Sequence, residues 1–155
     1  MSARAPTQLP ILLVEDSDED YEAFVRALNG VVVRTSLHRC TRGEEALDYL
    51  YGRSRFAAPA PAPRPALILL DLNLPGMDGR ELLAAIKGDA YLKSIPVVIV
   101  TTSHNPHDIA WCYTHGANSY QVKPMDYAEF RNDMRLLAEY WLSICILPAN
   151  AEERY

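Results

Sequence analysis

The stretch LILLDLNLPGMDG, residues 67–79, decides the fold of this 155-residue chain. Its first four residues are apolar without alternation, which predicts a short strand buried on both faces, as in a parallel sheet. The strand runs directly into a carboxylate, Asp71, and then into a turn with proline and glycine. Because an ionised carboxylate is costly to bury alone, we expect Asp71 to lie just beyond the strand, facing water or a cation.

Strands and helices alternate on both sides of this stretch. Apolar or β-branched runs predict strands at 11–14, 31–38, 67–70, 96–101 and 119–122. Helical spacing of apolar residues and helix-boundary residues predict helices at 16–29, 44–51, 79–88, 106–116 and from 126 onward. Five strands that alternate with five helices indicate an α/β fold with a doubly wound, five-stranded parallel sheet.

The chain is predicted to form one domain at 9–141, with a tail at 1–8 and an extension at 142–155. Within 57–65, proline occupies every second position from Pro59 onward. Neither a helix nor an interior strand accommodates that pattern, so we expect a stiff, extended connector on the surface.

Composition excludes several classes of function. The net charge of −5 argues against a nucleic-acid-binding surface, which needs a basic stripe. No apolar run approaches the ~20 residues that span a bilayer, and the first ten residues lack the apolar core of a secretory signal. Three cysteines without CxxC spacing favour reduced thiols. We therefore expect a cytoplasmic protein that binds neither membrane nor nucleic acid.

Polar side chains follow the ends of four predicted strands, at the edge where such sheets bind ligands. They are Glu15 and Asp16, Asp71, Thr101, and Lys123. Three carboxylates in one place attract a divalent cation, and hard oxygen ligands favour Mg²⁺. The lysine and the hydroxyl suit a phosphoryl group. We therefore predict a Mg²⁺ site in which Asp71 acts as a nucleophile and becomes an aspartyl phosphate.

The loop after the first strand argues against a nucleotide site. Phosphate-binding loops at this position are rich in glycine and offer backbone N–H groups. Residues 15–20 instead hold five acids in six positions. Such a loop repels a bare phosphate, attracts a metal ion and suits the start of a helix.

Four motifs, VEDSDED, LLDLNLPGMDG, VVIVTTS and YQVKP, resemble in this order the receiver domain of two-component response regulators. The resemblance covers residues 9–140 and implies a flavodoxin-like receiver fold. The spacing fits as well, since Thr101 lies 30 residues after Asp71 and Lys123 lies 22 residues after Thr101.

The resemblance implies how the acids act. Asp71 would accept the phosphoryl group from a sensor histidine kinase. Asp16 and Asp71 would bind Mg²⁺ directly, and Glu15 would hold a metal-bound water. The backbone carbonyl of Asn73 would complete the protein ligands.

The resemblance also implies a switch rather than an enzyme. Lys123 and Thr101 would contact phosphoryl oxygens, and Tyr120 matches the aromatic switch position. The chain does not lead into a DNA-binding module, so we expect output through protein contacts. Its long connector and its tail are similar to those of regulators that serve bacterial phytochromes, which implies a bacteriophytochrome as the kinase partner.

Two other functions compete with this one. A Mg²⁺-dependent phosphohydrolase with an aspartyl nucleophile uses similar acids. Such enzymes place a second acid two residues after the nucleophile, where this chain has Asn73, which cannot donate a proton as an acid. A receiver that binds partners without phosphorylation is the other alternative, and the intact acids, threonine and lysine count against it.

The last segment predicts a homodimer. The final helix places apolar residues on one face, which the sheet accounts for. The residues beyond it are apolar nearly all round, and we expect a second copy to cover them: Trp141, Leu142, Ile144, Ile146 and Leu147. The alternative is that this segment folds back on its own domain.

Overall fold

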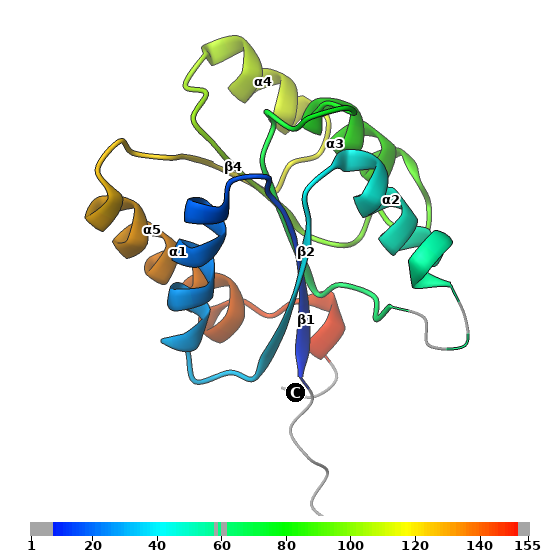
Figure 1. Cartoon of the computed structure of the whole chain (residues 1–155), viewed down its shortest axis with the longest axis horizontal. Coiled ribbons are helices and arrows are strands. Elements are labelled where there is room, and N and C mark those ends of the chain that lie inside the picture. The colour runs from blue at the N-terminus through cyan, green and yellow to red at the C-terminus, as the bar shows by residue number, and fades with distance from the viewer. Residues whose placement is uncertain (1–7, 58, 60–61, 152–155) are drawn as a thin grey trace, which may run out of the picture.

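The fold is seen in a computed structural model that describes residues 8–57, 59 and 62–151 (Figure 1). Most of the predicted tail, part of the connector and the last four residues lie outside this range. None of the helices within it is long and apolar enough to cross a membrane. In chain order the elements are β1 (Leu9–Val14), α1 (Asp18–Asn29), β2 (Thr35–Cys40), α2 (Gly43–Tyr51), η1 (Ser54–Phe56), β3 (Leu67–Leu70), α3 (Gly79–Gly88), β4 (Val97–Thr101), α4 (Pro106–Thr114), β5 (Ser119–Val122), α5 (Tyr127–Glu139), η2 (Tyr140–Ile144) and η3 (Pro148–Asn150).

The predicted doubly wound sheet is confirmed. The five strands are all parallel and lie in the order β2-β1-β3-β4-β5. The chain therefore moves outward from β1 to β2 and then crosses to β3 on the other side of β1. This change of direction between β1 and β3 is the point where doubly wound sheets bind ligands.

Helices cover both faces of the sheet, which explains the unbroken apolar runs. Figure 1 shows α1 and α5 on one face, with α2 and α3 on the other. Successive residues of β1 alternate between the two layers. Ile11 and Leu13 join the core beneath α1 and α5, whereas Leu12 and Val14 join the opposite core. A strand buried on both faces has no polar side to alternate with.

The second strand differs from its prediction. It spans Thr35–Cys40 rather than 31–38, whereas the other predicted boundaries lie within about two residues. After α1 ends, the chain must first cross the edge of the sheet, and pairing begins where the Leu9 N–H donates to the Arg34 carbonyl at 2.9 Å. Val31 and Val33 pack on the core during this crossing, so their β-branched pattern resembled a strand.

The C-terminal segment folds back partly on its own domain. After α5 the chain makes the wide π-helical turn η2 and becomes extended at Cys145, and the Leu147 N–H donates to the Asn150 side-chain oxygen at 2.8 Å. Leu142 and Leu147 are each only 1% exposed within the core beneath α1 and α5. Their predicted place on a dimer surface is therefore wrong. Ile144 and Ile146 are 64% and 40% exposed.

Candidate functional site

The strand registers bring the predicted site residues to one edge of the sheet. Val14 pairs with Leu70, so Glu15 and Asp71 both lie just past the ends of their strands. The Asp71 N–H donates to the Val14 carbonyl at 3.1 Å. On the other side of β3, the Lys123 N–H donates to the carbonyl of Thr101 at 2.7 Å. Residues more than 100 positions apart in the chain thus become neighbours.

Three carboxylates form the predicted metal-binding group. Glu15, Asp16 and Asp71 each offer an oxygen, and these oxygens lie within 4.8 Å of one another. Mg²⁺ binds oxygen at about 2.0–2.1 Å, so oxygens on opposite sides of one ion lie about 4 Å apart. The donor chemistry and the spacing therefore fit a hard divalent cation. Glu15 and Asp71 are buried, whereas Asp16 is exposed and reaches water.

The Lys123 ammonium lies among these acids and is buried with them. Its Nζ contacts Glu15 Oε2 at 2.8 Å, Asp20 Oδ2 at 2.8 Å and Asp71 Oδ2 at 3.1 Å. Burial disfavours the charged ammonium, but the attraction of Asp71 and Glu15 outweighs it and raises the pKa of Lys123 above its ordinary value. The lysine therefore remains a fixed positive charge at the edge of the sheet.

The carboxylates are not fully neutralised by this one lysine. Burial raises the pKa of Glu15 to about 7, because Lys123 offsets only part of the desolvation and Asp71 adds repulsion. A site with excess buried negative charge gains from a further cation. This electrostatic imbalance agrees with the metal-binding geometry.

The acidic loop is held in place from the neighbouring strand. Arg39 on β2 donates from Nε to the Glu15 carbonyl at 2.9 Å and pairs with Asp18 at 2.7 Å. Ser17 caps α1, since its hydroxyl accepts the Asp20 N–H at 3.3 Å. The loop therefore has a defined conformation, with Glu15 directed at Lys123.

Asp20 is a site residue that the sequence analysis missed. The sequence predicts Asp20 only as one of the acids at the start of a helix. In the structure its carboxylate contacts the Lys123 ammonium from the first turn of α1. The available signal was its place in the acidic run 15–20, because the first turn of a helix that directly follows a strand lies at the same edge of the sheet as the strand end.

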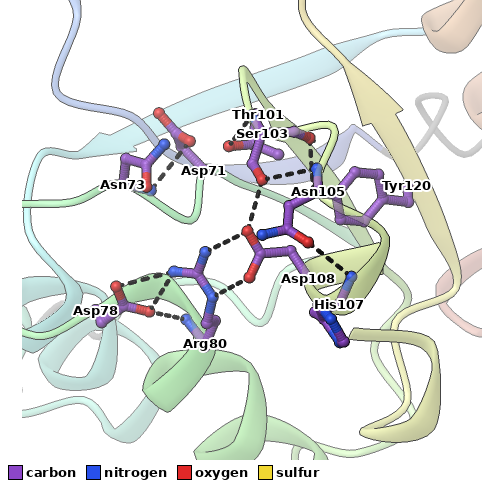
Figure 2. Close-up of polar contacts among 10 residues, drawn as sticks. All are labelled: Asp71, Asn73, Asp78, Arg80, Thr101, Ser103, Asn105, His107, Asp108 and Tyr120. Atoms are coloured by element: carbon purple, nitrogen blue, oxygen red, sulfur yellow. Dashed lines mark hydrogen bonds and ion pairs between the residues drawn. The ribbon is translucent and has the colours of Figure 1, made fainter. Parts of the chain in front are cut away.

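The loop after β3 packs tightly against the start of α3. The Asn73 N–H donates to Asp71 Oδ1 at 3.2 Å (Figure 2). The Gly79 N–H donates to the Leu72 carbonyl at 2.9 Å. A Cβ at Gly79 would collide with the carbonyl oxygen of Asp71 and with the backbone of Leu72, so only glycine fits there. The beginning of α3 thus has a fixed position relative to Asp71.

The two predicted switch residues are linked through Ser103. Thr101 is fully buried at the end of β4, and its hydroxyl accepts the Ser103 N–H at 3.4 Å. Tyr120 on β5 donates its hydroxyl hydrogen to the Ser103 carbonyl at 2.8 Å. The side chains of Thr101 and Tyr120 therefore meet the same loop residue from two neighbouring strands.

Comparison with known proteins places this arrangement in a large family. The family model for the response regulator receiver domain matches residues 11–135. The response regulator Rcp1 of Synechocystis sp. is 39% identical over 139 residues, which cover 90% of this chain and 92% of Rcp1. The probable methanogenesis regulatory protein FilR2 of Methanothrix harundinacea is 36% identical over 132 residues, covering 85% and 83% of the two chains.

Solved structures agree with the sequence matches. The Mn²⁺-bound form of Rcp1 superposes with a TM-score of 0.86 at 38% identity, covering 90% of this chain and 99% of that one. The phosphorylated cyanobacterial phytochrome response regulator RcpA also gives a TM-score of 0.86, at 40% identity and with 92% and 99% coverage. One relative thus binds a divalent metal ion and another is phosphorylated.

Proposed function

Since this chain belongs to the response regulator receiver domain family, we propose that Asp71 accepts a phosphoryl group from a sensor histidine kinase in a Mg²⁺-dependent reaction. One observation carries the proposal. Asp71 lies at the turning point of the sheet, between two further carboxylates and the Lys123 ammonium. These are the groups that a carboxylate nucleophile, a divalent cation and an incoming phosphoryl group require.

The proposed reaction is a single displacement at phosphorus. A carboxylate oxygen of Asp71 bonds to phosphorus while the bond from phosphorus to the phosphohistidine nitrogen breaks, and its electron pair stays on the imidazole. Asp16, Asp71 and the Asn73 carbonyl would hold Mg²⁺, and Glu15 would hold it through a water. When bound, the ion would offset the repulsion between the two anions. Lys123 would then turn from the Asp71 carboxylate to a phosphoryl oxygen.

The proposed signal leaves the site through Thr101 and Tyr120. The Thr101 hydroxyl would donate to a phosphoryl oxygen, and the loop that contains Ser103 would follow it. Tyr120 contacts the same residue and would respond with it. This is a change in protein contacts rather than turnover of a substrate.

The chemistry of the site favours a signalling role over a phosphohydrolase. A phosphohydrolase of the competing kind needs an acid two residues after its nucleophile, and Asn73 supplies none. The likeness to RcpA supports a bacteriophytochrome as the kinase. We place this signalling in the cytoplasm, without binding of nucleic acid.

Phosphoryl uptake is expected to depend on Mg²⁺ and on Asp16. With acetyl phosphate as donor, intact-mass spectrometry should show one added phosphoryl group that hydroxylamine removes. EDTA should abolish the addition. Asp16→Asn should weaken Mg²⁺ binding by at least about tenfold in calorimetry, because it removes a metal ligand but leaves the Lys123 ion pairs intact. Uptake at the full rate in EDTA would contradict the proposed metal dependence.

We propose in addition that two copies associate through the outer face of α5 and η2. Leu136, Tyr140 and Ile144 follow one another at four-residue spacing, and each is about half exposed or more. Ile146, two residues after Ile144, is also exposed, and Trp141 is half-buried next to Tyr140 in the chain. A two-fold partner that presents the same stripe would remove all of these side chains from water.

The dimer is tested best by a substitution on the exposed stripe, because truncation would remove the buried Leu147. The unchanged chain at tens of micromolar is expected to elute from a sizing column at about twice its monomer mass. Ile144→Asp should elute as a monomer, since it buries a charge in the interface. Tyr91→Asp, at an exposed tyrosine after α3, is the matched control and should remain dimeric. Equal elution of the Ile144→Asp variant and the unchanged chain contradicts this interface.

A further inference from the structure

A second ionic network lies beside the site and joins the start of α3 to α4 (Figure 2). The guanidinium of Arg80 contacts both carboxylate oxygens of Asp108, with Nε to Oδ1 at 2.9 Å and the terminal nitrogen to Oδ2 at 2.8 Å. Its other terminal nitrogen contacts Asp78 at 3.1 Å. Both members of the Arg80–Asp108 pair are mostly buried, with side chains 28% and 21% exposed. Two-point arginine–carboxylate contacts are among the strongest polar contacts in proteins.

Asp108 continues this network into the loop after β4. Its Oδ2 accepts the Ser103 hydroxyl hydrogen at 2.5 Å. Arg80 and Ser103 donate to Asp108 and lower the pKa of its carboxyl, so it stays charged at neutral pH. Ser103 also contacts Thr101 and Tyr120, as described above. One loop residue is therefore held by β4, β5 and α4 together.

The other end of the network is fixed against the phosphoacceptor. Arg80 directly follows Gly79, whose backbone lies against the backbone of Asp71 and Leu72. The Asp78 carboxylate caps α3 by accepting the Arg80 N–H at 2.8 Å. Arg80 therefore projects from a helix start that has no room to shift toward Asp71. The network spans the distance from Asp71 to the loop that follows Thr101.

We propose that Arg80 and Asp108 are positioning residues for the phosphorylation response, because their ion pair anchors Ser103 to the fixed start of α3. The inference rests on the proposed function. Movement of Thr101 toward a phosphorylated Asp71 must carry Ser103 with it, because only one residue separates the two in the chain. The Asp108 anchor opposes that movement. The pair thus stabilises the loop in the position that it has in this structure.

This role has a consequence for the rate of phosphorylation. A contact that holds the loop away from a phosphorylated Asp71 lowers the fraction of chains in which Thr101 can reach the phosphoryl group, so phosphoryl uptake and the apparent affinity for a phosphoryl mimic both fall with that fraction. Weakening the Arg80–Asp108 pair should therefore make Asp71 easier to phosphorylate, although neither residue is among those that form the metal-binding group or contact Lys123. A purely structural ion pair would change thermal stability without this gain.

The test compares Asp108→Asn with the unchanged chain. At saturating Mg²⁺ we expect phosphoryl uptake from acetyl phosphate to be about fivefold faster in Asp108→Asn, the lower range of typical coupling. In a Trp141→Phe background, Trp111 is the remaining tryptophan and lies on α4, three residues after Asp108. In Asp108→Asn, the fluorescence of Trp111 should change at a correspondingly lower beryllofluoride concentration than in the same background with Asp108 intact. Thermal denaturation is measured in parallel.

Further variants separate positioning from stability. Arg80→Met should speed phosphoryl uptake by a similar factor. The double variant Arg80→Met/Asp108→Asn should have the same rate as either single variant, because the two residues act through one contact. Ser103→Ala retains the ion pair but loses the hydrogen bond from the Ser103 hydroxyl to Asp108. Its phosphoryl uptake should also be faster than that of the unchanged chain. Glu22→Gln removes an exposed ion pair of α1 at 2.9 Å and should leave the rate unchanged.

The outcomes distinguish this inference from the proposed function. An unchanged chain that takes up no phosphoryl group overturns both. Uptake by the unchanged chain, with a rate in Asp108→Asn that is equal or slower, overturns the positioning role alone. Effects of Arg80→Met and Asp108→Asn that add in the double variant overturn the shared contact.

Discussion

Replacing Asp71 with asparagine is expected to abolish phosphoryl uptake completely. An amide is a poor nucleophile, and it also removes one of the negative charges that would hold Mg²⁺. The measurement is intact-mass spectrometry after incubation with acetyl phosphate and Mg²⁺, which should show no added phosphoryl group. The loss should not come from unfolding. Asp71 and Glu15 share one buried ammonium, so neutralising one acid should leave thermal stability equal or higher.

A control from the same edge of the sheet makes the result specific. Glu19 belongs to the same acidic run but is exposed, and it is not among the residues that contact Lys123. Glu19→Gln should therefore be labelled like the unchanged chain. Labelling that persists in Asp71→Asn would show that another residue accepts the group.

Replacing Lys123 with methionine is expected to cause the largest loss of stability among the site variants. It leaves Glu15 and Asp71 buried without their cation, and removing one partner of a buried ion pair costs about 3–5 kcal/mol. The free energy of unfolding in EDTA, measured by urea denaturation near pH 8, should fall by about this amount. An equal or higher free energy of unfolding in Lys123→Met contradicts the proposed charge balance.

The loss should depend on pH in a defined direction. The pKa of Glu15 is about 7 in the folded chain even beside Lys123, above its ordinary value, and removing the lysine raises it further. Between the unfolded and folded pKa values the folded state binds more protons, so stability falls as pH rises. The free energy of unfolding of Lys123→Met should therefore be closer to that of the unchanged chain near pH 5.5 than near pH 8. Mg²⁺ should restore part of the stability at the higher pH.

A second substitution tests the cause. Lys123→Met combined with Glu15→Gln removes one of the two unpaired carboxylates, so it should recover a large part of the stability near pH 8. No recovery would indicate that the methionine acts through packing rather than charge.

The order of the elements and the edge where the site lies were predictable from the sequence. The four apolar residues before Asp71 have no polar alternation, and only a strand covered on both faces tolerates that. Once the sheet is parallel, strand ends meet at one edge, so Glu15, Asp71 and Lys123 had to converge. These inferences succeed because burial and chain direction are recorded in short, local patterns.

Contacts between distant side chains were decided only by the tertiary structure. Asp20 and Lys123 are 103 residues apart, and Arg80 and Asp108 are 28 apart. A charged residue looks the same in the sequence whether it faces water or a partner. The pairing depends on which distant elements the fold brings side by side, and no local pattern records that.

The C-terminal segment shows the same division. Its apolar composition indicates side chains that gain from burial, and the structure buries Leu142 and Leu147 but leaves Ile144 and Ile146 exposed. The turn η2 and the extended residue after it place Leu142 and Leu147 in the core and leave Ile144 exposed. The backbone conformation thus gives apolar residues that are neighbours in the sequence different degrees of burial. Hydrophobicity alone has no direction, so the sequence determined which side chains gain from burial, and the fold determined which of them lie inside the domain.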